Sequence, residues 1–415
     1  MEESGKVSIA AIGIGNRTRK YLKYITAHPE SVELVAIVEC DAKRIAEAKH
    51  EYGLDDSACF TSAEVFFSVR RKIDAVIIGT PDNLHFEQCM AAISNGYHVL
   101  LEKPIAQTAE EWLEIENAAR RAGVKVSVCY VLRYHSYYMK LKEILHRRDL
   151  GKIISMHHTV NVGLDRMTHT YVRGPWGIEK DTTPIFLSKC CHDVDILLWL
   201  CEGRPNKVSS FGSLRWFRPE NAPEGSSDRC ITCAVEGCCP FSAVDLYRRR
   251  HSWIDNFIVP EGQTKDQVID EELKSGRFGR CVFHCGNDVM DNQITSFYTT
   301  DGVSIDITMV SMTREDGRHL RINCAYGEVV ADGNTIEVRH FNSDRKEFYD
   351  FTEINKLPLH GNADLAIIED FVDSVCIPER ALRSSIYDAI DSHLLCFKAE
   401  ESRLWGEVRV VYEKE

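Results

Sequence analysis

Between Val7 and Val131, short runs of β-branched residues alternate with longer stretches of helical periodicity. Such alternation is typical of parallel strands joined by crossover helices. It predicts a doubly wound α/β domain in the first third of the chain, with helices that end at Gly53, Gly96 and Gly123. The predicted strands cover residues 7–14, 33–38, 75–79, 98–101 and 125–130.

The pattern changes after Tyr134, where longer strand-like runs with polar loops replace the helical periods. A chain of 415 residues is expected to form two or three domains. We predict one domain over residues 1–132 and a second α/β domain over residues 133–415, built on a large, open, mostly antiparallel sheet. Residues 215–292 lack regular periodicity and are rich in cysteine, which predicts a loop-rich insertion with little core of its own.

The charge balance excludes several classes of partner. The chain carries 63 acidic and 50 basic side chains, a net charge of −13, which disfavours binding to nucleic acid or to an anionic membrane. No run approaches the roughly 18–20 apolar residues of a membrane span, and we recognise no signal peptide. The 16 cysteines are too sparse for a disulfide scaffold in a chain of this length, so we expect a cytoplasmic protein with mostly reduced thiols.

The first predicted strand leads into Gly13-Ile14-Gly15-Asn16-Arg17, where two glycines let the backbone approach a pyrophosphate at the N-terminus of the next helix. Thr18 stands where the third glycine or alanine of this motif belongs, which predicts wider packing between helix and strand. Glu39 ends the second predicted strand, where an acid binds an adenosine ribose and repels a 2′-phosphate. NAD is therefore favoured, while Lys43 and Arg44 leave NADP open.

Two further segments follow predicted strands: Thr80-Pro81-Asp82-Asn83-Leu84-His85 and Glu102-Lys103-Pro104. Together with the glycine motif, their order and spacing make the chain resemble the Gfo/Idh/MocA oxidoreductases, named after glucose-fructose oxidoreductase and inositol dehydrogenase. The resemblance implies an N-terminal Rossmann domain, a C-terminal α/β domain with an open sheet, and a homodimer or homotetramer.

The same two segments lie at carboxyl ends of parallel strands, where open sheets bind their ligands. The resemblance implies that Lys103 is catalytic, and a lysine in this position can exchange a proton with a substrate hydroxyl. Beside Gly13, Gly15, Asn16, Arg17 and Glu39, the predicted cofactor contacts are Thr80, Pro81, His85 and Glu102.

A predicted helix over residues 185–200 carries a second group of polar side chains. Residues four apart share a helix face, so Ser188 and His192, with Asp195 three further on, point the same way. The unperturbed pKa of histidine, about 6.5, suits His192 to proton exchange near neutrality. Related dehydrogenases carry an aspartate where Ser188 stands, so His192 is expected to act either with Lys103 alone or with Lys189 added to the site.

The resulting hypothesis is hydride transfer between a nicotinamide and a secondary hydroxyl or ketone of a sugar, cyclitol or related polyol. An alternative within the same fold is glycoside cleavage or rearrangement through transient oxidation by bound NAD. Another is a sensor that binds dinucleotide or sugar without turnover. The predicted substrate contacts are Arg133, Tyr134, Arg173, Trp176, Lys189 and Asp195, chosen for hydrogen-bond donors and flat apolar faces.

The insertion contains Cys230 and Cys233 with the spacing of a metal-binding pair, followed by Cys238 and Cys239. Cys281 lies further along the chain and can complete a shell. We take Cys230, Cys233, Cys238 and Cys281 as candidate ligands of a structural zinc ion. Free thiols and a disulfide remain the alternatives, because the second half of the motif lacks a regular pair.

Overall fold

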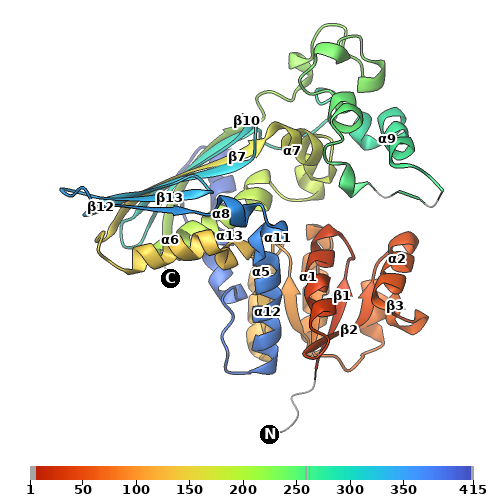
Figure 1. Cartoon of the computed structure of the whole chain (residues 1–415), viewed down its shortest axis with the longest axis horizontal. Coiled ribbons are helices and arrows are strands. Elements are labelled where there is room, and N and C mark those ends of the chain that lie inside the picture. Colours follow the sequence, from red (N-terminus) through yellow and green to blue (C-terminus); the bar gives the residue numbers. More distant parts are fainter. Residues whose placement is uncertain (1–5, 258, 261, 413–415) are drawn as a thin grey trace. The chain divides into compact units, whose positions relative to one another are not determined.

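A six-stranded parallel sheet forms the N-terminal part of the chain, in the strand order β3-β2-β1-β4-β5-β6. The computed structural model describes residues 6–257, 259–260 and 262–412 (Figure 1). The order reverses between β1 and β4, and open sheets bind ligands at such a reversal, beyond the carboxyl ends of the strands. The predicted doubly wound sheet is confirmed. Its strands are β1 (Val7–Ile12), β2 (Val32–Val38), β3 (Cys59–Phe60), β4 (Ala75–Ile78), β5 (His98–Leu101) and β6 (Val126–Val128).

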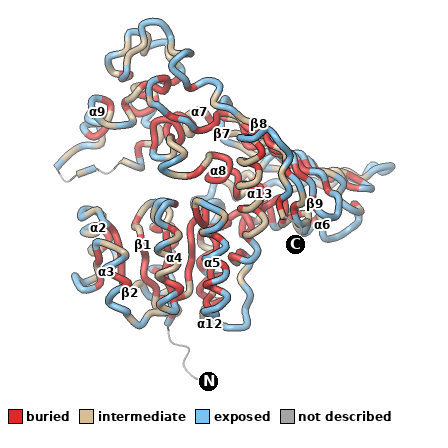
Figure 2. Tube along the Cα trace, turned by 180° about the vertical axis from the view of Figure 1, so that it is seen from behind, coloured by how far each residue is buried: buried red, intermediate tan, exposed pale blue. Residues whose placement is uncertain are grey.

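Local capping signals define the helices between these strands. Asp41 caps one helix by accepting hydrogen bonds from the backbone of Lys43 and Arg44, and Thr108 forms a capping box with Glu111. Figure 2 shows that β1 is buried along its length, whereas the edge helix α2 is largely exposed. The helices are α1 (Asn16–Ala27), α2 (Ala42–Tyr52), α3 (Ala63–Ser68), α4 (His85–Ser94) and α5 (Ala109–Ala122).

A nine-stranded sheet follows, in the order β14-β13-β12-β11-β7-β10-β9-β8-β15. Strands β7 and β10 are parallel, whereas β8, β9, β11, β12, β13 and β15 pair antiparallel with their neighbours. The prediction of a mostly antiparallel sheet is confirmed. The strands are β7 (Ile153–Gly163), β8 (Pro205–Ser213), β9 (Asn292–Thr299), β10 (Ser304–Thr313), β11 (Gly317–Cys324), β12 (Gly327–Ala331), β13 (Thr335–His340), β14 (Lys346–Asp350) and β15 (Arg409–Val410).

The remaining helices complete these two parts of the chain. They are α6 (Ser136–His146), α7 (Leu164–Arg166), α8 (Ile185–Cys201), α9 (Lys265–Lys274), α10 (Thr352–Asn355), α11 (Pro358–Gly361), α12 (Ala363–Cys376) and α13 (Ile386–Trp405). Among the described residues, no helix is both long enough and apolar enough to cross a membrane.

The chain divides into two compact units, and the division differs from the predicted boundary at residue 132. The first, here the Rossmann unit, combines Met1–Asp149 with Val194–Glu202 and Tyr349–Phe397. The second, here the sheet unit, comprises Leu150–Asp193, Gly203–Phe348 and Lys398–Glu415. The late segment returns to the Rossmann unit because Ile367 and Phe371 of α12 are fully buried in one core with Tyr21 of α1.

The insertion at residues 215–292 belongs to the sheet unit and has a small core, which corrects the expectation that it has little core of its own. Cys230, Leu246, Tyr247, Ile269 and Leu273 are buried together in it. Aromatic rings extend this cluster: His169 stacks on Phe278 with 4.6 Å between ring centroids, and Trp253 stacks on His169 at 5.1 Å. Short helical turns and α9, rather than strands, carry most of this region.

Candidate active site

The loop between β1 and α1 leaves open space where a phosphate group would lie. Gly13 has a positive φ of 79°, and a Cβ atom there would lie 2.8 Å from Cγ2 of Thr80. A Cβ atom at Gly15 would meet no described atom within 4 Å. Gly15 precedes Asn16, the first residue of α1, so its backbone lies at a helix N-terminus, which favours anions. These features fit a dinucleotide pyrophosphate.

Thr18 fits on the helix because another glycine faces it. Its hydroxyl donates a hydrogen bond of 2.6 Å to the carbonyl oxygen of Gly13, and the residue is fully buried. A Cβ atom at Gly79 would lie 2.2 Å from that hydroxyl oxygen. The space that the motif usually obtains from its third glycine therefore comes from Gly79, at the end of β4. The absence of a Cβ atom at Gly79, rather than the predicted wider packing between helix and strand, makes room for Thr18.

Glu39 sits at the end of β2 with only 6 % of its surface exposed. One carboxylate oxygen accepts a hydrogen bond of 2.8 Å from the backbone of Ile14, and the other accepts one of 3.1 Å from Asp41. The carboxylate is thus fixed beside the glycine loop. This is the position from which an acid binds the ribose of a dinucleotide.

Glu102, at the end of β5, belongs to a buried polar network. Its Oε1 accepts hydrogen bonds from Nε of Arg17 at 2.8 Å and from the Tyr21 hydroxyl at 2.6 Å. Arg17 also forms an ion pair of 2.9 Å with Asp364. Burial alone would raise the pKa of Glu102, but the charges of Arg17 and Lys103 and the hydrogen bonds from Tyr21 and Arg17 together hold the pKa below its usual value.

This network engages part of the Arg17 side chain. Its Nε and Nη2 contact Glu102, Tyr21 and Asp364, and its predicted contact with the cofactor stays a prediction. Glu102 likewise orients the end of β5, and its Oε2 accepts a hydrogen bond of 3.2 Å from the backbone of Lys103. The network therefore fixes the backbone from which the Lys103 side chain departs.

His85 joins two loops at the end of the Rossmann sheet, and its predicted contact with the cofactor stays a prediction. It is 1 % exposed, and its Nδ1 lies 2.7 Å from the carbonyl oxygen of Pro104 while its Nε2 lies 3.0 Å from that of Thr80. Burial lowers its pKa. The imidazole therefore joins the loop after β4 to the loop after β5. Thr80 is held further by a hydrogen bond of 2.7 Å to Gln88.

A histidine that the sequence did not suggest holds the loop that follows Lys103. His393 of α13 accepts a hydrogen bond of 3.0 Å from the backbone of Ile105, and its other ring nitrogen lies 2.6 Å from the Tyr130 hydroxyl. Burial, reinforced by the charge of Lys103, lowers the pKa of His393 to about 3. The ring is therefore neutral, with its proton on Nδ1, which lies near both the Tyr130 hydroxyl and the carbonyl oxygen of Ala389. Because 288 residues separate His393 from Ile105, no local pattern could reveal this contact.

In the sheet unit, helix α8 carries Lys189 and the half-buried His192. Lys189 has no hydrogen bond or ion pair with any described residue. Burial, together with the charges of Arg318 and Arg166, lowers its pKa to about 8. The adjacent Asp193 is 1 % exposed and accepts hydrogen bonds from His158 at 2.8 Å and Arg318 at 2.6 Å. Sequence analysis missed Asp193 because it lies on a different helix face from His192.

Three predicted substrate contacts are instead engaged in the Rossmann unit. Arg133 is 5 % exposed and forms two parallel hydrogen bonds with Asp195, at 2.8 and 2.6 Å. Tyr134 is 6 % exposed and donates a hydrogen bond of 2.8 Å to Asp370. These pairs satisfy buried polar groups, and the roles of Arg133, Asp195 and Tyr134 in substrate recognition stay predictions.

Arg173 is completely buried, and its Nε donates a hydrogen bond of 2.7 Å to the carbonyl oxygen of Arg280 within the insertion. Trp176 lies in a short 3-10 turn, Pro175–Gly177, and is partly buried. The predicted substrate contacts all stay predictions, and of the six side chains Trp176 and Lys189 are the ones not fully buried.

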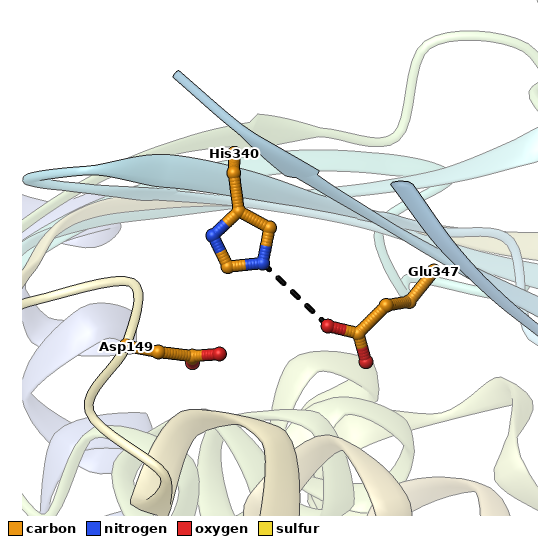
Figure 3. A group of neighbouring side chains, drawn as sticks. All are labelled: Asp149, His340 and Glu347. Carbon is orange, nitrogen blue, oxygen red and sulfur yellow. Dashed lines mark ion pairs between the residues drawn. The ribbon is translucent and has the colours of Figure 1, made fainter. Parts of the chain in front are cut away.

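One further pair of ionisable residues lies on neighbouring strands of the large sheet. Nε2 of His340 on β13 is 3.5 Å from a carboxylate oxygen of Glu347 on β14 (Figure 3). Arg345 also binds Glu347, at 2.9 Å. The carboxylate is thus shared between two basic groups, and we assign the pair a structural role in joining β13 to β14.

Comparison with known proteins agrees with this geometry. The model of the Gfo/Idh/MocA family, described as an oxidoreductase family with an NAD-binding Rossmann fold, matches residues 7–130. Residues 7–130 therefore carry the NAD-binding Rossmann domain of this oxidoreductase family. The matched range includes the glycine loop, Glu39 and Lys103.

Individual relatives of the chain are distant in sequence. The YteT protein of Bacillus subtilis is 22% identical over 313 residues, 72% of this chain and 69% of its own. A 1,5-anhydro-D-fructose reductase of Ensifer adhaerens is 28% identical over 46% of this chain and 56% of its own. An inositol 2-dehydrogenase of Streptomyces avermitilis is 26% identical over 54% of this chain. The chain spans 60% of the length of that dehydrogenase.

Solved structures share the fold across nearly the whole chain. An oxidoreductase of Agrobacterium radiobacter, in complex with NAD+, L-tartaric acid and magnesium, has a TM-score of 0.70 and 14% identity, with 98% of this chain and 99% of the other covered. The WlbA dehydrogenase of Bordetella pertussis, in complex with NADH and UDP-GlcNAcA, has a TM-score of 0.69 and 17% identity, with 99% of each chain covered. At such identities, the likeness shows the fold alone.

Proposed function

We propose that the protein transfers a hydride between NAD and a secondary hydroxyl, or the corresponding ketone, of a sugar, cyclitol or sugar derivative. The observation that carries this proposal is the construction of the loop at Lys103. Glu102, His85 and His393 fix the backbone on both sides of this lysine, in the same unit as the glycine loop. The names of the relatives, an inositol dehydrogenase and an anhydrofructose reductase, support the substrate class.

The cofactor is assigned to the switch point of the Rossmann sheet. Gly13, Gly15 and Asn16 would receive the pyrophosphate, and Thr80 and Pro81 would line the nicotinamide side. Glu39 would bind the adenosine ribose, and its fixed negative charge disfavours a 2′-phosphate, so NAD is preferred over NADP. When bound, the nicotinamide supplies the hydride acceptor or donor.

The proton chemistry is assigned to two residues. Lys103 provides an ammonium group that donates to a developing alkoxide, and His192 accepts or returns the hydroxyl proton. Lys189 supplies a second cation for a substrate hydroxyl or acidic substituent, since its ammonium forms no ion pair with a described residue, although Asp316 and Asp193 favour its charged form. Trp176 offers a flat apolar face to a sugar ring.

The predicted homo-oligomer has support in the exposed apolar side chains of the large sheet. Phe211 on β8 is 68 % exposed and faces Ile294 on β9, its cross-strand partner, which is 50 % exposed. We propose that this face mediates association of copies of the chain. Light scattering should show a dimer or tetramer for the intact protein and a smaller species for Phe211→Glu.

The functional test is a screen of polyols and keto sugars with NAD and NADP, followed by nicotinamide absorbance. For the best substrate, we expect Lys103→Ala to lower kcat by about 10²–10⁴-fold while the cofactor Kd stays within a few-fold. Lys23→Ala, at an exposed lysine of the same unit, is the matched control and should keep its activity. Wild-type turnover in Lys103→Ala would reject the assignment. Cofactor binding without turnover of any substrate would favour a sensor, and aglycone release without net NADH would favour glycoside cleavage.

A further inference from the structure

Four cysteines from three separate segments of the insertion line one small cavity. They are Cys230, Cys233, Cys239 and Cys281. The cavity has ≈ 10 Å³ of space for the centre of a water-sized sphere, which is room for about one such sphere. Cys238, a ligand in the sequence prediction, is exposed and does not line the cavity, so its neighbour Cys239 replaces it.

Backbone contacts bring these segments together. An isolated antiparallel bridge joins Arg229 to Arg280, the residues that precede Cys230 and Cys281. The backbone of Cys281 donates a hydrogen bond of 2.8 Å to Asp228. Two short turns fix the other cysteines, because Cys233 donates to the carbonyl oxygen of Cys230 at 3.2 Å and Cys239 donates to that of Glu236 at 3.2 Å. The backbone thus positions all four thiols around the same space.

A buried cation on the wall of this cavity has no carboxylate partner. Arg173 lines the cavity, is 0 % exposed, and donates hydrogen bonds to the carbonyl oxygens of Arg280 at 2.7 Å and Phe241 at 2.5 Å. Its third contact is the sulfur of Cys230, at 3.7 Å. Within the described part of the chain, no acid pairs with Arg173, and its Nη1 has no hydrogen-bond partner.

The carboxylate that lines the cavity, that of Glu236, binds other side chains. Glu236 is the only acidic residue among the described residues that line the cavity, and it binds Arg249 at 2.6 Å and also Ser242. A guanidinium stays charged in proteins, and an unpaired charge in the interior is costly. A negative group that is part of the cavity itself would remove this cost. Four thiolates around one divalent cation carry a net charge of −2 and would do so.

We propose that Cys230, Cys233, Cys239 and Cys281 bind one structural zinc ion, and that Arg173 balances part of the charge of the zinc–thiolate group. Four thiolates close the tetrahedral shell, so the ion keeps no open position for a substrate. Binding of Zn²⁺ by four thiols releases four protons to solvent. The ion would tie the two ends of the insertion, near residues 230 and 281, into one unit.

Binding requires the side chains to converge. No three of these sulfur atoms lie within 4.8 Å of one another in the described part of the chain, whereas tetrahedral zinc with bonds of about 2.3 Å holds its sulfurs about 3.8 Å apart. Rotation of the thiols into the cavity supplies the movement, since the space between them is open. We therefore expect the metal-free cluster to be looser than the metal-bound one.

The test measures metal content, independently of enzymatic activity. Protein purified under reducing conditions should contain about one zinc per chain, and Co²⁺ exchanged into it should give the intense absorption of a tetrahedral cobalt–thiolate site. Cys230→Ser, Cys233→Ser, Cys239→Ser and Cys281→Ser should each lose most of the zinc. Cys238→Ser is the matched control, since it removes the exposed neighbour of Cys239, and it should keep the metal.

One variant separates loss of a ligand from loss of the fold. Cys239→His should retain zinc, because imidazole is also a zinc ligand, whereas Cys239→Ser should not. Wild-type protein without zinc that also gives no thiolate spectrum with added Co²⁺ would overturn the proposal. Equal metal loss in Cys238→Ser and Cys239→Ser, or a disulfide among these cysteines under reducing purification, would also overturn it.

Discussion

Arg17 in the Rossmann unit and Arg173 in the sheet unit differ in how their charges are balanced. The side chain of Arg17 is 32% exposed and yet has two carboxylate partners, Glu102 at 2.8 Å and Asp364 at 2.9 Å. Arg173 is entirely buried and, among the described residues, has none. Water could solvate the first charge but not the second. The difference teaches that side chains of the Rossmann unit balance the charge of Arg17, whereas no described carboxylate balances that of Arg173, which the proposed zinc–thiolate group would do.

The largest effect on stability is expected for substitution of Arg17, whose charge is balanced by carboxylates. Arg17→Met leaves two buried carboxylates, those of Glu102 and Asp364, without their shared cation. We expect it to lower the free energy of unfolding by about 2–4 kcal/mol, less than for a fully buried pair because Arg17 is partly exposed. Denaturant unfolding of both proteins measures this difference.

Arg19→Met is the control for this prediction, because Arg19 pairs with Glu47 and Glu51 at the surface. It should change stability by less than about 1 kcal/mol. Equal effects of the two substitutions would show that the network around Glu102 does not stabilise the unit.

The same contrast explains what the sequence could predict. In the Rossmann unit, the bounds of β5 agree with the prediction at every residue and α2 ends at the predicted Gly53, because strand periodicity and the glycine are local signals. The glycine loop and Glu39 could be identified for the same reason. His393 and Asp364 could not, because each reaches its partner across hundreds of residues of chain.

In the insertion, the sequence could predict some of the residues that line the cavity but not all of them. The spacing of Cys230 and Cys233 is a local signal, and it identified the correct pair lining the cavity. The choice between the adjacent Cys238 and Cys239 depends on a single turn, Glu236–Cys238, which directs Cys239 inward. Arg173 was assigned to substrate recognition because its type suits that role, and only its complete burial reveals that it faces the insertion.

An intermediate effect on the free energy of unfolding is expected for substitution of Arg173, and its size should depend on whether zinc is bound. With zinc bound, Arg173→Met removes the cation that faces a dianionic cluster. Without zinc, it removes an unbalanced buried charge along with hydrogen bonds to two carbonyl groups. We expect the substitution to cost about 2 kcal/mol more in the zinc-bound protein than in the metal-free protein. Thermal unfolding of both proteins with and without a chelator measures this difference.

Arg280→Met is the matched control, since Arg280 directly precedes the candidate ligand Cys281 and is only partly buried. Its cost should depend much less on the metal. A cost at Arg173 that is the same with and without zinc would contradict the role of this cation as a counter-charge.

The smallest effect on stability is expected for substitution of Lys189. This cation of the sheet unit forms no ion pair with a described side chain. Its folded-state pKa of about 8 lies below the ordinary 10.5, so the charged form is disfavoured by folding. This penalty is complete below pH 8 and disappears as the pH rises toward 10.5. Lys189→Met should therefore stabilise the substrate-free protein by about 1 kcal/mol near neutral pH, after allowance for partial exposure, and the gain should vanish near pH 10.

Unfolding of wild type and Lys189→Met across this pH range measures the gain, with Lys23→Met as the exposed control. A gain that does not change with pH would mean that the ammonium has a counter-charge in the folded chain. If an acidic substrate raises wild-type stability but leaves Lys189→Met unchanged, this lysine is a cation held ready for the substrate. Lys189 would then resemble Arg173 rather than Arg17, since both would obtain their balancing charge from a bound group.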